Sequence, residues 1–282
     1  LPLAVLVILF PFCMLWLLPV VKFVRELWRQ KRMTAGLPGP PALPLIGNLL
    51  NVDRSAEGFT KNMIWRTNSL SSIGHELGCT WILHRCFITP LTGRAVKDIV
   101  DSSEEITKGH DYDLLLPWLG RGLLLNTGDA WRARRRLLTP TFHFSQLDSY
   151  ISAMNRHAKV FVDEILIDRI DSKFDLYPLI KLCSLDIICE TAMGKELNAQ
   201  HNPAQPYVTA VSRLAQLSIE TMSKPYLWSR TVRKLIGKEQ EFMGYVNTAR
   251  DFSHSVIEER RTALERGEVE QNKRAFLDLL LM

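Results

Sequence analysis

The chain has 282 residues, of which 46% are hydrophobic, and 35 lysines and arginines against 30 aspartates and glutamates give it a net charge of +5. This size and apolar content are enough for one large domain. The mildly basic balance suits an anionic membrane surface or an acidic protein partner. The positive charge is not concentrated enough for nucleic-acid binding, and no nucleic-acid-binding motif accompanies it. Nucleic acid is therefore excluded as the expected partner.

The first segment is apolar. Residues 1–21 contain no charged side chain, and 21 positions are enough to cross a bilayer core of about 30 Å at about 1.5 Å per residue. A cleaved signal peptide is the alternative, but its apolar part is usually about 7–15 residues long and precedes small residues. Here large residues and charges follow at once, so we expect a retained transmembrane anchor over 1–21.

A basic and then proline-rich stretch, residues 22–48, follows the anchor. Only Glu26 opposes the cations Lys22, Arg25, Arg29, Lys31 and Arg32. Because cations beside a span tend to stay in the cytosol, the bulk of the chain is expected there. Five cysteines at no regular spacing agree with a reducing compartment. The run LPGPPALPLIGN at 37–48 favours a stiff hinge that sets the attitude of a domain to the membrane, or alternatively an ordinary linker or a polyproline ligand.

Short elements follow the hinge. Apolar residues at helical spacing predict a helix over 59–77, and residues rich in β-formers predict strands over 80–85 and 86–89. The stretch 102–126 contains several glycines, Pro117 and many leucines, and we expect a long loop, a kind of segment that usually carries function.

The segment from 122 to 147, GLLLNTGDAWRARRRLLTPTFHFSQL, is the most informative part of the chain. Asp129 is predicted to cap a helix that ends before Pro140. Trp131 and Arg135 are four residues apart and therefore share a face. An indole N–H and a guanidinium on one face can both donate to carboxylates, which suits a dianionic cofactor such as haem with its two propionates. The alternative is a core aromatic residue beside a solvated basic face.

This segment resembles the C helix of the cytochrome P450 monooxygenases, with the Trp-x-x-x-Arg motif of that family at Trp131 and Arg135. It is most similar to the fatty-acid ω-hydroxylase branch, family 4. The run LDIICETAMG at 185–194 resembles the E helix of the same branch, and the hinge at 37–48 resembles the proline hinge of microsomal members. The resemblance implies that Trp131 and Arg135 contact the haem propionates.

The resemblance also implies a fold class, mainly α with a small β-sheet. Residues 49–282 then form the N-terminal part of the catalytic domain, with helices A to G and the first hairpin, and the resemblance places the B helix over 91–101. Helices are expected over 149–170 and 179–193, within 206–237, and over 239–265. In the family the loop at 102–126 roofs the substrate pocket, so the candidate lining residues are Leu114, Leu116, Leu123 and Leu125. Three further arginines lie off the Trp131 face and either dock an acidic reductase or form a solvated face: Arg132, Arg134 and Arg136.

The cysteine thiolate that ligates the haem iron in the family has no match in this sequence. None of its cysteines lies in the glycine-framed loop that the family uses, so no catalytic residue and no metal ligand is assigned within the chain. The apolar run at 276–282 leads, in the family, toward the oxygen-binding helix. We therefore expect the sequence to be the N-terminal half of a longer protein, with its axial cysteine beyond Met282.

The function implied by the resemblance is hydroxylation of lipophilic substrates, fatty-acid-like or xenobiotic. The reaction uses O2 and electrons from an NADPH-dependent flavoprotein reductase, with haem as the cofactor. The expected location is the endoplasmic reticulum membrane, with the catalytic part facing the cytosol. The alternative is a catalytically inactive short isoform or gene fragment, tethered to the membrane without haem chemistry.

Overall fold

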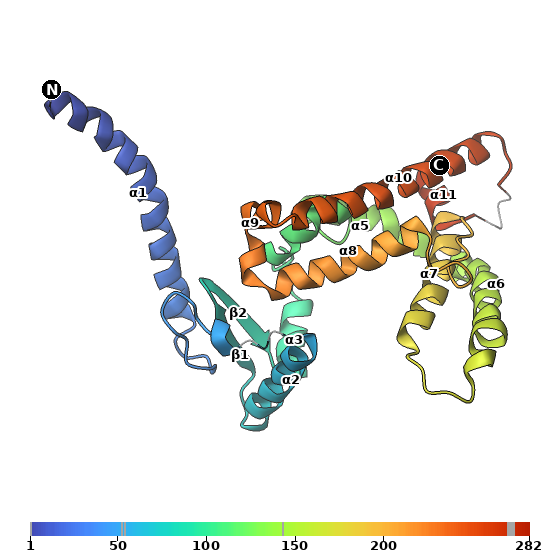
Figure 1. Cartoon of the computed structure of the whole chain (residues 1–282), viewed down its shortest axis with the longest axis horizontal. Coiled ribbons are helices and arrows are strands. Elements are labelled where there is room, and N and C mark those ends of the chain that lie inside the picture. The colour runs from blue at the N-terminus through green and yellow to red at the C-terminus, as the bar shows by residue number, and fades with distance from the viewer. Residues whose placement is uncertain (1, 52, 54, 143, 270–273) are drawn as a thin grey trace. The chain divides into compact units, whose positions relative to one another are not determined.

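The computed structural model describes residues 2–51, 53, 55–142, 144–269 and 274–282, without the side chains of 2–16, 56, 144–146 and 149. The described chain is mainly helical and contains one two-stranded antiparallel sheet. This result confirms the predicted fold class. The chain separates into two compact units, Leu1–Glu105 and Ile106–Met282 (Figure 1).

The first unit begins with the helix α1 (Pro2–Met33), which has Lys31 and Arg32 in its last turn. Cations at that end are favoured by the helix dipole. Within the described part of the chain, no helix combines the length and the hydropathy that a membrane crossing needs. The anchor was predicted over 1–21, and the side chains of residues 1–16 lie outside the part that the structure describes. The anchor therefore stays a prediction.

The sheet is a hairpin of β1 (Leu77–Ile82) and β2 (Arg85–Pro90), in which Ile82 lies opposite Arg85. The first strand was predicted three residues too late, over 80–85, and the second was predicted one residue short at each end, over 86–89, with no turn between them. The chain turns at Leu83, which has a φ of 55° although it is not glycine. Two-residue hairpin turns usually contain Asn or Gly, and this turn contains neither residue.

The proline-rich segment lies along β1 as an additional edge. The backbone N–H of Cys79 donates to the carbonyl of Pro38 at 2.8 Å, and Gly47 forms an isolated bridge with Ile82. A Cβ atom on Gly39 would overlap the Cys79 carbonyl, so glycine is needed where the two backbones meet. Within this unit the segment is therefore fixed on the hairpin by backbone contacts.

Two helices complete the first unit beside the turn η1 (Leu49–Asn51). The helix α2 (Ala56–Ser72) begins at Ser55, whose hydroxyl accepts from the Gly58 N–H at 3.0 Å, and α3 (Gly93–Val100) is capped by Thr92. Both follow the predicted helices, but α2 ends five residues early. Gly74, with a φ of 89°, turns the chain toward β1 there.

The second unit is helical throughout. The predicted loop at 102–126 contains the short helical turns η2 (His110–Leu115) and α4 (Leu116–Leu119). The single helix predicted over 149–170 is α6 (Phe144–Val160), which continues into a π-helical turn η4 (Phe161–Leu166) and the 3₁₀ turn η5 (Ile167–Arg169). The remaining elements are α5 (Gly128–Leu138), η3 (Thr139–Phe142), α7 (Tyr177–Met193), α8 (Pro206–Ser223), η6 (Pro225–Trp228), α9 (Arg230–Leu235), α10 (Lys238–Glu265) and α11 (Phe276–Leu281).

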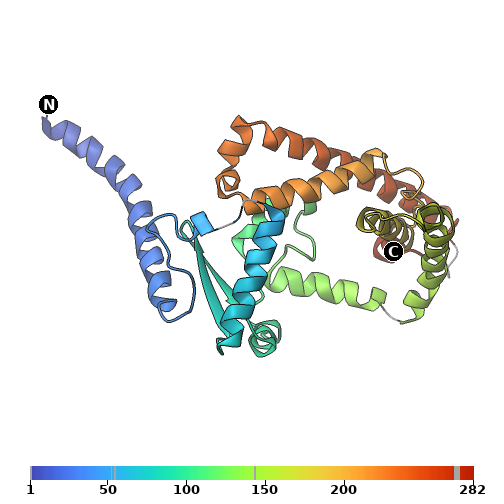
Figure 2. The same cartoon turned by 60° about the horizontal axis from the view of Figure 1, so that its bottom comes forward.

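The core of the second unit forms where α8 and α10 run side by side, as both views show (Figure 1, Figure 2). Leu214 of α8 packs there against Val246 and Ala249 of α10. The rings of Tyr207 and Phe252 stack with their centroids 4.0 Å apart. A second buried cluster joins α7 to α8 through Cys189, Leu197, Ala199 and Val208. The two clusters together hold α7, α8 and α10 against one another.

Candidate functional site

The candidate site lies on α5, which contains the motif singled out in the sequence. Thr127 is the residue that precedes the helix, and its side chain makes no capping hydrogen bond. The predicted cap at Asp129 is wrong, because the helix already begins at Gly128. Asp129 lies in the first turn, where a carboxylate is favoured by the helix dipole, and it accepts a hydrogen bond from Arg132 at 2.9 Å.

Trp131 and Arg135 lie on one face of α5, as their spacing predicts. The guanidinium carbon of Arg135 is 5.4 Å from the centroid of the Trp131 ring, within the range of a cation–π contact. Trp131 is half-buried and Arg135 is exposed. The indole therefore gives the arginine a fixed support, while the donor groups of the guanidinium stay open to a ligand.

The charge on this helix is largely uncompensated. Arg132 pairs with Asp129, whereas in the described part of the chain no carboxylate lies within 4.0 Å of Arg134, Arg135 or Arg136. Arginine stays charged at any physiological pH and binds carboxylates in a forked geometry. The exposed face of α5 can therefore accept a ligand that carries more than one carboxylate.

The four leucines predicted to line a substrate pocket have different environments. Leu114, in η2, lines a pocket with Pro117 of α4 and with Leu217 and Phe242 of α8 and α10. Leu116 and Leu123 are half-buried and Leu125 is buried, and none of the three lines this pocket. The structure thus brings Leu114 to a cavity, and the role predicted for all four stays a prediction.

Comparison with known proteins decides the family. The model of the cytochrome P450 family matches residues 37–282. The chain belongs to the cytochrome P450 family. Cytochrome P450 4c3 of Drosophila melanogaster is 36% identical over 234 residues, which cover 81% of this chain and 42% of that protein. Cytochrome P450 4V2 of Homo sapiens is 33% identical over 273 residues, 93% of this chain and 51% of that protein. This P450 chain therefore spans about half the length of the curated relatives it matches.

Haem is the cofactor of the cytochrome P450 family. Its two propionates are carboxylates, and the residues on α5 fit them. Arg135 offers a forked set of N–H donors without a carboxylate partner among the described residues, and Trp131 lies on the same face. The donor chemistry of this P450 segment is compatible with a propionate ligand, and the contact of Trp131 and Arg135 with the haem propionates stays a prediction.

One buried charge cluster of this P450 was missed at the level of sequence. The Glu239 carboxylate is buried and accepts hydrogen bonds from Arg230 at 2.8 Å and from Arg233 at 2.9 Å. Burial acts to raise the pKa of Glu239, but the two arginines outweigh it and hold the pKa below its ordinary value. The signal was local: two arginines three residues apart, followed by an acidic residue two positions after a glycine.

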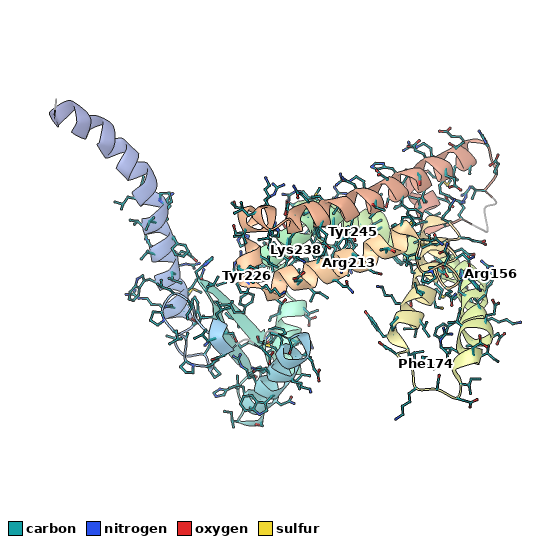
Figure 3. The ribbon with its side chains drawn as sticks, in the orientation of Figure 1. Arg156, Phe174, Arg213, Tyr226, Lys238 and Tyr245 are labelled. Carbon is teal, nitrogen blue, oxygen red and sulfur yellow. The ribbon has the colours of Figure 1, made fainter. Side chains whose placement is uncertain are left out.

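The ion pairs continue between α8 and α10, where Figure 3 labels Arg213, Lys238 and Tyr245. Glu220 of α8 accepts from Lys238 of α10 at 3.0 Å, and Arg213 donates to Glu241 at 2.5 Å. Such pairs between half-exposed groups are each worth only about 0–1 kcal/mol. They fix the register of the two helices beside the Leu114 pocket more than they stabilise the fold.

Proposed function

We propose that the complete protein is a haem-dependent monooxygenase that hydroxylates lipophilic substrates, fatty-acid-like or xenobiotic, with O2 and electrons from an NADPH-dependent flavoprotein reductase. Membership of the family and its similarity to family 4 proteins support this proposal. The observation that carries it is the Trp131–Arg135 pair on the exposed face of α5. Haem bound through a cysteine thiolate supplies the oxygen chemistry of such enzymes.

The part that this chain plays is to bind and orient the cofactor. The Arg135 guanidinium supplies a permanent positive charge and directed N–H donors for a propionate. Trp131 fixes that guanidinium by its ring and offers an indole N–H on the same face. Leu114, Leu116, Leu123 and Leu125 remain the proposed apolar lining for substrate.

The test is haem retention in the complete gene product. Arg135→Ala removes charge-assisted hydrogen bonds that are each worth about 1.5–3 kcal/mol, so we expect haem affinity to fall by about tenfold or more. Haem per polypeptide is measured from the pyridine haemochromogen absorbance after dialysis against apomyoglobin. Arg135→Lys keeps the charge but not the forked geometry, and an intermediate loss is expected.

The matched control is Arg134→Ala. It removes the same charge from the next position of α5, about 100° around the helix from Arg135. Haem retention close to that of the unaltered protein is expected. Full haem content in Arg135→Ala, or an equal loss in both variants, would refute the role proposed for Arg135. The carbon-monoxide difference spectrum of the reduced protein reports whether the retained haem has a thiolate ligand.

We further propose that Arg134 and Arg136 dock the acidic surface of the reductase, with Arg132 contributing less because it already pairs with Asp129. Exposed charges of this kind act mainly on the rate of association. The variant Arg134→Glu/Arg136→Glu is expected to slow reduction by the reductase at low salt, and the difference should shrink at high salt. Unchanged reduction at low salt would remove these residues from the interface.

A membrane location is the last element of the proposal. The described part of α1 exposes Leu17, Leu18, Val20 and Val21, and cations follow them. We propose an anchor over 1–21, a hinge over 22–48 and a catalytic part from 49 onward on the cytosolic face of the endoplasmic reticulum. Deletion of residues 2–21 should release the protein on alkaline carbonate extraction. In sealed microsomes, protease should digest the catalytic part of the unaltered protein, and protection of that part would overturn the orientation.

A further inference from the structure

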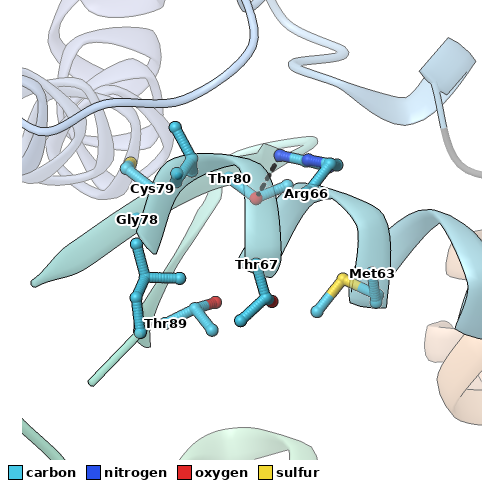
Figure 4. Close-up of a pocket in the computed structure, with 9 residues that line it drawn as sticks. Met63, Arg66, Thr67, Gly78, Cys79, Thr80 and Thr89 are labelled. Carbon is cyan, nitrogen blue, oxygen red and sulfur yellow. Dashed lines mark hydrogen bonds between the residues drawn. The ribbon is translucent and has the colours of Figure 1, made fainter. Parts of the chain in front are cut away.

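The Arg66 side chain lines a pocket of the first unit, where α2 packs on the β1–β2 hairpin. Figure 4 shows Arg66 of α2 at this pocket beside Thr80 of β1, with Thr67 and Met63 from the same helix and Thr89 from β2. Leu70 also lines it. The wall is thus made of hydroxyl groups near one guanidinium and of apolar side chains beyond them.

The helix α2 presents Arg66 within an apolar stripe. Phe59, Met63, Arg66 and Leu70 follow one another at spacings of four and three residues and so share one face of the helix, and Ile73 is the residue that caps its end. Phe59 is 38% exposed and Ile73 is 69% exposed, so the stripe continues to solvent at both ends of the pocket. Arg66 therefore lies at one end of the apolar run formed by Leu70 and Ile73, which matches a ligand with a charged head and a hydrocarbon chain.

The Arg66 guanidinium is incompletely satisfied. Its Nη2 donates to the Thr80 hydroxyl at 2.9 Å, and in the residues that the structure describes no carboxylate lies within 4.0 Å of it. Burial lowers the pKa of Arg66 below its ordinary value. A guanidinium has five N–H donors, and a partly desolvated cation without a counter-charge is costly. An anion in this pocket would supply the missing acceptor and the missing charge.

We propose that this pocket binds an amphiphilic oxyanion, with its carboxylate or phosphate on Arg66 and its hydrocarbon chain along Leu70 and then, beyond the pocket, toward Ile73. The Thr80 hydroxyl, which accepts a hydrogen bond from Arg66, is free to donate to the head group, and Thr67 and Thr89 line the same pocket. A fatty acid and an anionic phospholipid share this chemistry. The site lies in the first unit and uses no residue of α5, so it stands apart from the haem function proposed above.

The experiment is photo-labelling of the full chain in neutral detergent micelles with a diazirine analogue of palmitic acid, mapped by mass spectrometry. The label is expected on peptides of α2 and the hairpin. Arg66→Gln is expected to lower labelling of these peptides by about tenfold, since it removes a charge-assisted bond worth about 1.5–3 kcal/mol. Arg66→Lys, which keeps the charge, is expected to retain part of the labelling.

The matched control is Lys61→Gln, which removes the same charge from α2. Lys61 lies on the opposite side of the helix and pairs with Glu57 at 2.6 Å. Labelling in this variant is expected to equal that of the unaltered chain. Unchanged labelling in Arg66→Gln, or an equal loss in Lys61→Gln, would overturn the proposal. Circular dichroism confirms that each variant keeps its helical content, so a loss in Arg66→Gln is not a loss of fold.

Competition separates the two sources of the ligand. Unlabelled palmitate that competes while phosphatidic acid does not identifies a fatty-acid site, and the reverse identifies a lipid head-group site. Competition by both supports the shared chemistry. Methyl palmitate has the same chain without the charge, and if it competed as well as palmitate the assignment to Arg66 would fail. No arm of this experiment needs haem, so its failure and a failure of haem retention are distinguishable.

Discussion

The side-chain oxygen of Asn48 accepts a hydrogen bond from the backbone N–H of Trp81 at 2.8 Å and so joins the proline-rich segment to β1. Its amide nitrogen donates to the carbonyls of Pro40 at 3.2 Å and Pro41 at 3.0 Å. Asn48 is only 2% exposed. Asn48→Ala leaves these buried groups unpaired, and we predict a loss of about 2–4 kcal/mol in the docking of residues 37–48.

Amide hydrogen exchange measures this loss. The N–H groups of Trp81 and Cys79, which bond to the docked segment, are expected to exchange much faster in Asn48→Ala. Asn68→Ala changes an exposed residue of α2 and is the control, with exchange at both sites expected to stay as in the unaltered chain. Protection of Trp81 that survived the loss of Asn48 would show that backbone contacts alone hold the segment.

A buried ion pair fixes the last helix of the second unit. Asp278 of α11 is fully buried and accepts from Arg260 Nε at 2.8 Å and from the Ala275 N–H at 2.7 Å. Removal of one partner leaves an uncompensated buried charge, so Asp278→Ala is predicted to destabilise the unit by about 3–5 kcal/mol. Urea unfolding followed by circular dichroism measures this change.

A double variant separates the two contributions to that loss. Arg260→Leu/Asp278→Leu removes both charges, and it is expected to be more stable than Asp278→Ala. Asp251→Ala, on an exposed position of α10, is expected to change stability by less than about 0.5 kcal/mol. If the double variant were as unstable as Asp278→Ala, lost hydrogen bonds rather than the unpaired charge would be the main cause of the loss of stability.

Acid is predicted to weaken the Glu239 cluster. The pKa of Glu239 in the folded chain is below its ordinary value of 4.5, because Arg233 and Arg230 outweigh the opposing effect of burial. Stability from this carboxylate is therefore complete above about pH 4.5 and is lost as the pH falls through the lower folded value. Glu239→Gln should be less stable than the unaltered chain at pH 7, and the difference should shrink toward pH 3.

Urea unfolding at several pH values tests this sign. Glu258→Gln is the control, because Glu258 pairs with Arg261 on an exposed part of α10 and is expected to contribute little at any pH. A stability difference between Glu239→Gln and the unaltered chain that grew on acidification would contradict the prediction. It would mean that the folded chain favours the protonated form of the Glu239 carboxyl group over the ionised form.

The long helices were predictable from the sequence, because their apolar spacing persists over many turns. Helices were expected over 179–193 and 239–265, and the structure has α7 at Tyr177–Met193 and α10 at Lys238–Glu265. Short turns such as η2 and α4 were not expected, since four to six residues do not establish a period. The hairpin turn at Leu83 was misplaced, because its sequence lacks the usual turn residues.

The environment of α7 shows a second limit. Its residues are apolar on most sides, which is typical of a buried helix, yet Ile188 is 52% exposed while Cys189 is buried. Composition gives the tendency of a face to be buried but does not name the element that covers it. In the described chain, α7 packs on α6 and α11 through one part of its surface.

The two candidate sites also differed in how far the sequence could predict them. The contact between Trp131 and Arg135 follows from a four-residue spacing on one helix, so the sequence predicted it. The contact between Arg66 and Thr80 joins a helix to a strand 14 residues away, and it depends on how α2 packs on the hairpin. No local pattern encodes that packing, and the second pocket was therefore found only in the structure.

The two cysteines of the hairpin give a final prediction. The sulfur atoms of Cys79 and Cys86 are 3.3 Å apart, and burial together with Cys79 raises the pKa of the Cys86 thiol to about 12. The thiolate is the nucleophile, so alkylation of Cys86 by iodoacetamide at pH 8 should be on the order of 1,000-fold slower than that of glutathione. Mass spectrometry of the Cys86 peptide gives the rate.

In 8 M urea the two rates should converge, and Cys79→Ser should speed the native reaction because it removes one of the causes of the raised pKa. A native rate equal to that of glutathione would mean that the hairpin opens to solvent at this point.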